Sequence, residues 1–304
     1  MLSVGRVGLE VTPRTVRVAV VHRLRRLVRR QLYAEVPLEP DVFVPAWDRE
    51  NVRDEEAFRT YLGAALRRAG AAGGRIRVAL PDLTARLRIL PSQRPPTPPH
   101  GLHKYAVWRL RTECVPSPAR IAPAFYLNGH PTQGYLAVLV AGTAALAQIE
   151  RLIREAGAEP VRITTTATAL FDLINGRLAR RGEEKGAAGI LVAAHPSATL
   201  FVTSDGAPVF ARTFHHTWAH AFCERSITAI CAEVAASLDA CADTGLPFPK
   251  RMLLAGEHAP TRGLAEAMTD RLSIPCDVAS LPWRLRGQTL FPPQGIGALA
   301  AAHR

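Results

Sequence analysis

The fold is decided by the stretch Gly189–His216, which reads GILVAAHPSATLFVTSDGAPVFARTFHH. Residues Ile190–Val192 form one apolar run, and Thr199–Thr203 form a second. Asp205-Gly206 lies between two apolar segments and is typical of a tight hairpin turn. The stretch therefore predicts a strand, a short loop, a strand, a tight turn and a third strand.

The N-terminal part of the chain contains a looser copy of this layout. Gly8–Val11 is followed by a break at Thr12–Arg14 and then by the strand Thr15–Val21, in which valines occupy alternate positions. A further strand over Leu27–Val36 is expected after the basic turn, in a meander with Val4–Val11. Two β-loop-β units, one opening each half of the chain, predict an internally duplicated α/β protein. In that architecture the loops of the paired units often grip a phosphate.

Composition indicates an ordinary globular protein of two domains. A chain of 304 residues exceeds the usual size of a single hydrophobic core, and 48% hydrophobic with 21% charged residues is typical of such proteins. No apolar stretch approaches the roughly 20 residues of a membrane span, and no secretory signal pattern follows Met1. We therefore expect a cytoplasmic protein that reaches a membrane only through a partner.

Cysteine and histidine spacing gives little support for a metal site. The five cysteines are scattered and form no CxxC pair, which argues against a disulfide framework or a zinc ribbon. The densest group is His216, His220 and Cys223, which could share one helix face and suit zinc if a helix begins by Thr217. The alternative is that these residues simply begin a long helix, and we expect no metal.

The net charge of +12 is concentrated in part near His22–Arg30. Such a run suits an anionic membrane surface or an acidic partner, although a solvated hairpin turn in a protein rich in arginine throughout is the simpler explanation. No nucleic-acid-binding module is visible, so we expect no specific nucleic-acid partner. The candidate contact residues are Arg23, Arg25, Arg26, Arg29 and Arg30.

Helix and loop signals fill in the rest of the chain. The segment Thr143–Ala156 is a clear amphipathic helix that Gly157 ends, and Trp218–Ala242 predicts a longer one. Four prolines in the run Ser92–Gly101 predict an exposed loop with polyproline character. The polar, glycine-flanked run Arg181–Ala188 is the best domain boundary.

The order of these elements resembles that of the actin-like superfamily, and most closely the PilM branch of type IV pilus assembly proteins, relatives of the division protein FtsA. The resemblance covers nearly the whole chain through matching order and spacing. The segments that carry it are Arg77–Pro91 (RVALPDLTARLRILP), Tyr135–Leu170 (strand, helix and the next strand-helix), the exit Gly206–Arg212 of the second hairpin, Met252–Val278 (MLLAGEHAPTRGLAEAMTDRLSIPCDV) and Pro292–Arg304 (PPQGIGALAAAHR).

The chain departs from this family at each nucleotide motif. Members that bind ATP carry an Asp-x-Gly-type turn in each phosphate hairpin, where the acid organises Mg²⁺ and glycine lets backbone N–H groups approach the phosphates. The first hairpin instead reads Glu10-Val11-Thr12, and Pro13 removes an N–H donor. The second reads Ala193-Ala194-His195, and the adenosine motif reads Ala255-Gly256-Glu257-His258.

These departures predict that nucleotide chemistry has been lost. We expect no catalytic residue and no cofactor, which makes the chain a pseudo-ATPase. The alternative is an active actin-like ATPase that binds ATP and Mg²⁺ through unusual residues. In either case the candidates for the degenerate nucleotide site are Glu10, Thr12, Ser197, Thr199 and Gly256.

The resemblance implies a two-lobed actin-like fold, related to a duplicated ribonuclease H-like unit. The first lobe would span residues 1–188 with a small inserted α+β subdomain at about 83–157, and the second would span 189–304. It further implies a scaffold of a type IV pilus or type II secretion-like machine, which binds the short cytoplasmic tail of an inner-membrane partner. Self-association, as in other actin relatives, stays open.

Overall fold

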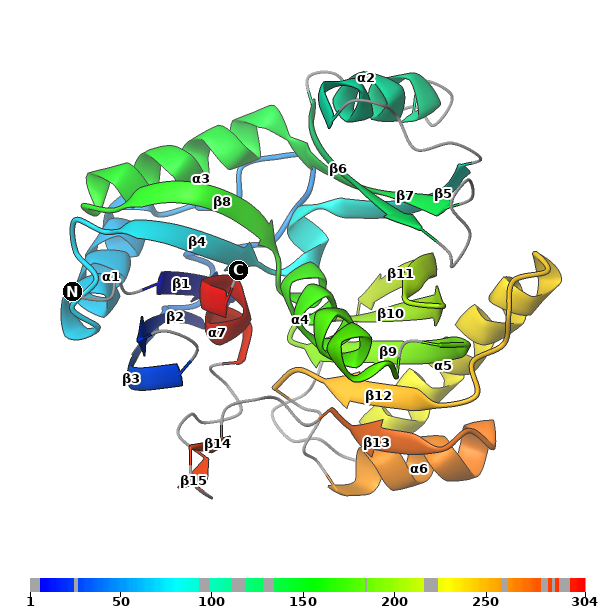
Figure 1. Ribbon diagram of the computed structural model, residues 1–304. Helices are drawn as coiled ribbons and strands as arrows, with labels where there is room; N and C mark the ends of the chain where they lie inside the picture. The colour runs from blue at the N-terminus through cyan, green and yellow to red at the C-terminus, as the bar shows by residue number, and fades with distance from the viewer. Residues whose placement is uncertain are drawn as a thin grey trace. The chain divides into compact units, whose positions relative to one another are not determined.

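The computed structural model describes residues 6–24, 27–92, 99–110, 119–127, 134–183, 185–215, 224–257, 262–279, 284–285, 288–289 and 296–303 (Figure 1). The strands are β1 (Arg6–Val11), β2 (Thr15–Leu24), β3 (Leu27–Pro37), β4 (Arg75–Leu80), β5 (Arg86–Ser92), β6 (Ala119–Leu127), β7 (Gly134–Gly142), β8 (Glu159–Thr165), β9 (Ala187–Ala194), β10 (Ser197–Ser204), β11 (Ala207–His215), β12 (Met252–Ala255), β13 (Cys276–Val278), β14 (Arg284–Leu285) and β15 (Gln288–Thr289). The α-helices are α1 (Glu55–Arg68), α2 (Pro99–Leu110), α3 (Thr143–Glu155), α4 (Thr166–Arg181), α5 (Glu224–Asp243), α6 (Arg262–Leu272) and α7 (Ile296–His303), and a short 3₁₀ helix spans Asp82–Thr84.

The chain forms two compact units, each of several segments. The first unit consists of Met1–Thr84, Ala144–Leu173 and Ser280–Arg304. The second consists of Ala85–Thr143 and Ile174–Ala279. This grouping differs from a single division at residue 188, because the insert between β4 and α3 counts with the second unit. The lobe boundaries expected from the sequence therefore stay a prediction.

The first unit is built on a five-stranded sheet of order β3-β2-β1-β4-β8. Strands β1, β2 and β3 are antiparallel neighbours, whereas β4 pairs parallel with both β1 and β8. Alternate residues of these strands face a core beneath α1 and α3, so the valines of β2 are buried while α3 contributes Ile149, Leu152 and Ile153. Helix α3, which the sequence placed inside the insert, thus packs into the core of the first unit.

Helix α1 shows how local sequence sets the ends of an element. Asp54 is its N-cap and accepts a hydrogen bond from the Ala57 N–H at 3.0 Å. Glu55 and Glu56 occupy the first turn and Arg67 and Arg68 the last, as the helix dipole favours. The chain then leaves the helix through Gly70, whose φ of +63° is accessible to glycine at little cost.

The second unit contains a five-stranded sheet of order β11-β10-β9-β12-β13. Its first three strands are antiparallel, and β12 pairs parallel with β9 and β13. Helices α5 and α6 cover one face, with Ile230, Val234 and Leu264 in the core. A separate three-stranded antiparallel sheet, β5-β7-β6, carries α2 on one face.

The predicted internal duplication is confirmed. With strands numbered in chain order within each sheet, both five-stranded sheets have the order 3-2-1-4-5 and the same sequence of antiparallel and parallel pairs. The hairpin turn at Asp205-Gly206 is also confirmed, because both residues have positive φ, +49° and +78°.

Helix α2 begins earlier than the sequence predicts. It starts at Pro99, inside the run that was expected to be a loop, because proline at the first helical position loses no hydrogen bond and already has a helical φ. Residues 93–98 lie outside the described chain. Among the described helices, none is long and apolar enough to span a membrane.

The face of the first sheet opposite α1 and α3 is covered by α7. Most residues of this helix, IGALAAAH, are glycine or alanine, and Ala298, Ala300 and Ala301 are buried. Its backbone lies so close to β1 that a Cβ atom on Gly8 would stand 1.9 Å from the Ala298 carbonyl oxygen. Glycine at position 8 is therefore required for α7 to dock.

We expect the substitution Gly8→Ala to lower the free energy of unfolding by about 1–3 kcal/mol or more, because the backbone contact cannot yield as a side chain would. The matched control is Gly176→Ala inside α4, where the new Cβ would meet Arg180 at an ordinary 3.8 Å. That control should be neutral or stabilising by up to about 1 kcal/mol. Urea unfolding of both variants measures the difference, and equal stability of the two would contradict the packing described.

Candidate functional site

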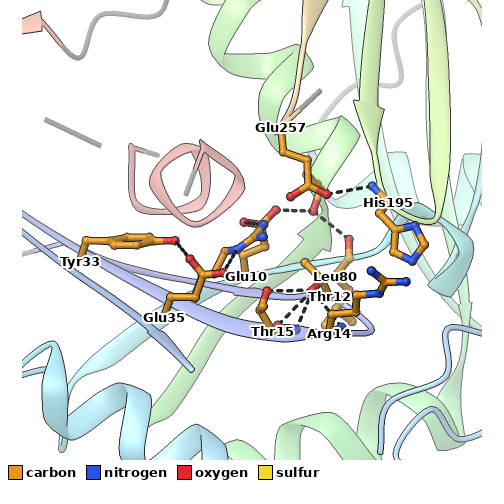
Figure 2. A network of polar contacts seen from close by, with 11 residues as sticks. Glu10, Thr12, Arg14, Thr15, Tyr33, Glu35, Leu80, His195 and Glu257 are labelled. Atoms are coloured by element: carbon orange, nitrogen blue, oxygen red, sulfur yellow. Dashed lines mark hydrogen bonds and ion pairs between the residues drawn. The ribbon is translucent and has the colours of Figure 1, made fainter. Parts of the chain in front are cut away.

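The first turn, Thr12–Thr15, joins β1 to β2 and is closed by its own threonine. The Thr12 hydroxyl oxygen accepts hydrogen bonds from the backbone N–H groups of Arg14, at 3.2 Å, and of Thr15, at 2.9 Å. The Thr12 N–H donates to the Thr15 carbonyl at 2.9 Å, and Pro13 has no N–H. Figure 2 shows these contacts converging on Thr12. The amides that could receive a phosphate here are thus engaged within the turn.

Glu10 is the next-to-last residue of β1 and lies on the face covered by α7, and its carboxylate belongs to a buried polar network. Its Oε2 atom lies 3.5 Å from the Arg17 guanidinium, and its Oε1 accepts a hydrogen bond from the Thr166 hydroxyl at 3.4 Å. Glu10 is 3% exposed and Arg17 6%, so each charge depends on the other for compensation.

The network continues across the sheet to β3. Arg17 also pairs with Glu35 at 3.3 Å. The Tyr33 hydroxyl donates to Glu35 at 2.7 Å, and Figure 2 shows Tyr33 pointing toward Glu35. Cross-strand register explains this arrangement, because Glu10, Arg17 and Glu35 are direct neighbours on β1, β2 and β3. The Glu10 carboxylate is therefore held by protein groups, and α7 packs on it so closely that a Cβ on Gly297 would lie 1.9 Å from Oε1.

The second turn, Ala194–Ser197, joins β9 to β10 within the second unit. The His195 N–H donates to the Glu257 carboxylate at 3.2 Å (Figure 2). Glu257 follows Gly256, whose φ of +102° and close approach to Ala193 exclude any other residue, since a Cβ would stand 2.2 Å from the Ala193 carbonyl oxygen. A carboxylate of the chain thus takes the position of an anion at this turn.

The remaining nucleotide candidates are buried in strand β10. Ser197 and Thr199 are each 1% exposed, and the Thr199 hydroxyl shares a 2.9 Å hydrogen bond with the Thr213 hydroxyl on β11. In the first unit, Glu10 and Thr12 lie two residues apart in the sequence. In the second unit, Gly256 lies against Ala193 of β9, and Thr199 forms a hydrogen bond to the neighbouring strand β11.

Sequence reasoning missed three polar residues of this region, namely Arg17, Asp82 and Thr166. Asp82 is 4% exposed, and its carboxylate accepts the Ala167 N–H at 2.8 Å, so it caps α4 from a distant segment. A buried acid directly after an apolar strand was the available signal for Asp82. Arg17 gave no comparable signal, because it alternates with valines as a solvent-facing residue would.

Other predicted sites fall wholly or partly outside the described residues. The described residues do not include His216, His220, Cys223, Arg25 or Arg26. The backbone of Arg23 lies on β2 and that of Arg29 and Arg30 on β3, and these two strands pair antiparallel. Across the described part of the chain, no three His, Cys, Asp or Glu side chains are grouped as metal ligands would be.

Comparison with solved structures gives this chain an actin-like fold. A protein of Bacteroides thetaiotaomicron described as having an actin-like ATPase fold and unknown function matches 98% of this chain and 95% of its own, with a TM-score of 0.53 and 6% identity. The predicted fold class is therefore confirmed. The sequence itself matches no protein-family model and no curated protein.

The likeness is stronger to a protein of pilus assembly. A chain of the PilM–PilN type IV pilus biogenesis complex matches over 98% of both chains, with a TM-score of 0.78 and 21% identity. The cytoplasmic domain of EpsL, an inner membrane component of the type II secretion system of Vibrio cholerae, covers 98% of this chain and 94% of its own, with a TM-score of 0.50 and 10% identity. The resemblance to the PilM branch read from the sequence thus agrees with the structural neighbours.

We expect Thr12→Val to lower the free energy of unfolding by about 1–3 kcal/mol, because it leaves the Arg14 and Thr15 N–H groups without their acceptor at nearly constant volume. The control is Thr244→Val, an exposed threonine whose hydroxyl only donates to carbonyl groups at the end of α5. Its effect should stay within about 0.5 kcal/mol. Denaturant unfolding measures the stability of both variants. A Thr12→Val variant as stable as the control would contradict the hydrogen bonds assigned to the Thr12 hydroxyl.

Alkaline unfolding tests the polar network. Burial, and then the hydrogen bond to Glu35, raise the pKa of Tyr33 well above its ordinary value of about 10. A raised pKa contributes stability below about pH 10 that is lost as the pH rises. We therefore expect Tyr33→Phe to be less stable than wild type by about 1 kcal/mol near pH 8. The difference in free energy of unfolding should narrow by about pH 11. At that pH the phenol ionises in the unfolded wild type but stays neutral in the folded state, which lowers the stability of wild type only. Urea unfolding at both pH values measures it, and a constant gap would contradict the assignment.

Proposed function

We propose that this chain is a non-catalytic scaffold of a type IV pilus or type II secretion-like assembly, acting at the cytoplasmic face of the inner membrane. Its fold supports this role, because the chain matches a component of the PilM–PilN complex from end to end. The likeness to the cytoplasmic domain of EpsL, an inner membrane component of a secretion system, points to the same setting.

The observation that carries the proposal is the closure of both turns by the chain itself. In the first turn the Thr12 hydroxyl binds two amides, and in the second the Glu257 carboxylate binds the His195 amide. Phosphate binding by such turns depends on backbone N–H groups that are free to point at the ligand. The residues present therefore do not fit a nucleotide phosphate, and a pseudo-ATPase without ATP or Mg²⁺ is the reading they support.

The rival function is an actin-like ATPase with divergent phosphate loops. It would require Thr12 and Glu257 to give up their hydrogen bonds, and Glu10 to leave Arg17 and turn toward a metal. Breaking a buried ion pair in this way costs about 3–5 kcal/mol, which a nucleotide would have to supply from its own binding energy. This cost makes the scaffold the better proposal.

The partner in this proposal is an inner-membrane protein with a short cytoplasmic tail. Such a tail can bind as an added strand, with its main chain paired to a sheet edge and apolar side chains in adjacent pockets. In the β5-β7-β6 sheet the outer strands are β5 and β6. Pro123 interrupts the N–H groups of β6 in mid-strand, whereas Arg86–Leu90 of β5 keeps an unbroken run but also contacts β11 of the same unit.

Isothermal titration of the full chain tests the proposal with two ligands. One is a synthetic peptide of the short cytoplasmic tail of the proposed inner-membrane partner, and the other is Mg-ATP. We expect micromolar binding of the peptide, no heat from Mg-ATP, and a peptide affinity that Mg-ATP leaves unchanged. A peptide of scrambled order is the control and should not bind.

Micromolar binding of Mg-ATP that is lost in Glu10→Ala would overturn the pseudo-ATPase reading and favour the rival. Circular dichroism of the variant must show a folded chain for that result to count. The scaffold role as stated would be overturned if neither the tail peptide nor the scrambled control peptide bound to the chain.

A further inference from the structure

The insert between β4 and α3 holds an unequal share of the charge of the chain. The segment Ala85–Thr143 contains seven Lys and Arg residues and a single acidic residue, Glu113, which gives a net +6 out of the +12 of the whole chain. This excess is separate from the arginine run Arg23–Arg30. Half of the net charge thus lies in about a fifth of the sequence.

Helix α2 presents the outer face of this insert. Its inner side is fixed by Ala106 and Leu110, which are buried against β7. Lys104 and Trp108, four residues apart, share the opposite face because helical residues spaced by four are neighbours. Trp108 is 59% exposed, and it is among the few large hydrophobic side chains that the described residues leave exposed. Figure 1 shows α2 lying on one side of the three-stranded sheet.

The neighbouring side chains hold this face in a defined geometry. The Tyr105 ring lies 5.7 Å from that of Trp108, and its hydroxyl shares a 2.8 Å hydrogen bond with Ser92. Arg109 donates to the Pro91 carbonyl at 3.2 Å. The aromatic pair is therefore anchored to β5, and these contacts hold Trp108 in a fixed position on the helix surface.

The surroundings of Trp108 are basic. Helix α2 has the sequence PHGLHKYAVWRL, which contains no acidic residue, and His103 and Lys104 are exposed. Arg86 and Arg88 of β5 are also exposed, and at a spacing of two residues they share one face of the strand with Leu90, which packs under α2. They consequently lie on the side of the sheet that carries the helix.

We propose that the outer face of α2 binds an anionic lipid surface directly, with Trp108 seated among the headgroups and Lys104 and its basic neighbours held by lipid charge. Tryptophan favours the membrane interface because its ring is apolar and its N–H polar, and juxtamembrane cations gain about 1 kcal/mol each from anionic lipid. One projecting aromatic on a basic face suits shallow insertion, whereas a protein interface needs a broader apolar centre.

This inference does not depend on the proposed function, because it needs no partner protein. The test is co-sedimentation of the full chain with vesicles of phosphatidylcholine alone or with about 30 mol% phosphatidylglycerol. We expect binding to the anionic vesicles only, weakening steeply as NaCl rises from about 0.1 M to about 0.5 M. Trp108→Ser should reduce the partition coefficient about tenfold and Lys104→Gln about fivefold.

Matched controls use the same residue types elsewhere in the second unit. Phe248→Ser removes a 51% exposed aromatic side chain, and Lys250→Gln an exposed lysine, and neither should change the partition coefficient. Thermal denaturation checks that all four variants are folded. The proposal is overturned if wild type ignores anionic vesicles at low salt, which would assign the face to an acidic protein. It is also overturned if the α2 variants bind like wild type, which would assign lipid binding to another basic segment.

Discussion

Backbone N–H groups at a tight turn must find an acceptor, and this requirement governs both hairpins of the duplicated fold. A phosphate can be that acceptor, but so can an oxygen atom of the chain. Here the first turn uses the Thr12 hydroxyl and the second the Glu257 carboxylate. The two units thus have the same sheet topology, but they supply the acceptor for the turn amides differently. In the first unit it comes from within the turn, and in the second from a residue far along the sequence.

The two solutions also differ in how they can be lost. Thr12 lies inside its own turn, so its hydrogen bonds form locally with the β1–β2 hairpin. Glu257 reaches its turn from the end of β12, and it depends on the positive φ of Gly256 to approach β9. Gly256 therefore serves to bring the internal carboxylate to the turn.

Much of the fold could be predicted from the sequence because its signals are local. The alternating valines of β2, the Asp205-Gly206 turn and the apolar face of α3 all follow from periodicity and turn chemistry. The burial of Glu10 and Arg17 could not be predicted. Both residues lie on the polar face of β1 and β2, and that face looks solvent-exposed in the sequence because nothing in the pattern shows that α7 covers it. The start of α2 at Pro99 was missed for a different reason, since a proline-rich run gives no sign of which proline is the first residue of a helix.

The packing of α7 on β1 has a consequence for how the protein is made. Gly297 follows Gly8 by 289 residues, yet the two positions lie in one layered unit with Glu10 between helix and sheet. During synthesis, the ion pair of Glu10 and Arg17 stays open to water until α7 has left the ribosome. Strand β1 is therefore made long before α7, the helix that covers its polar face.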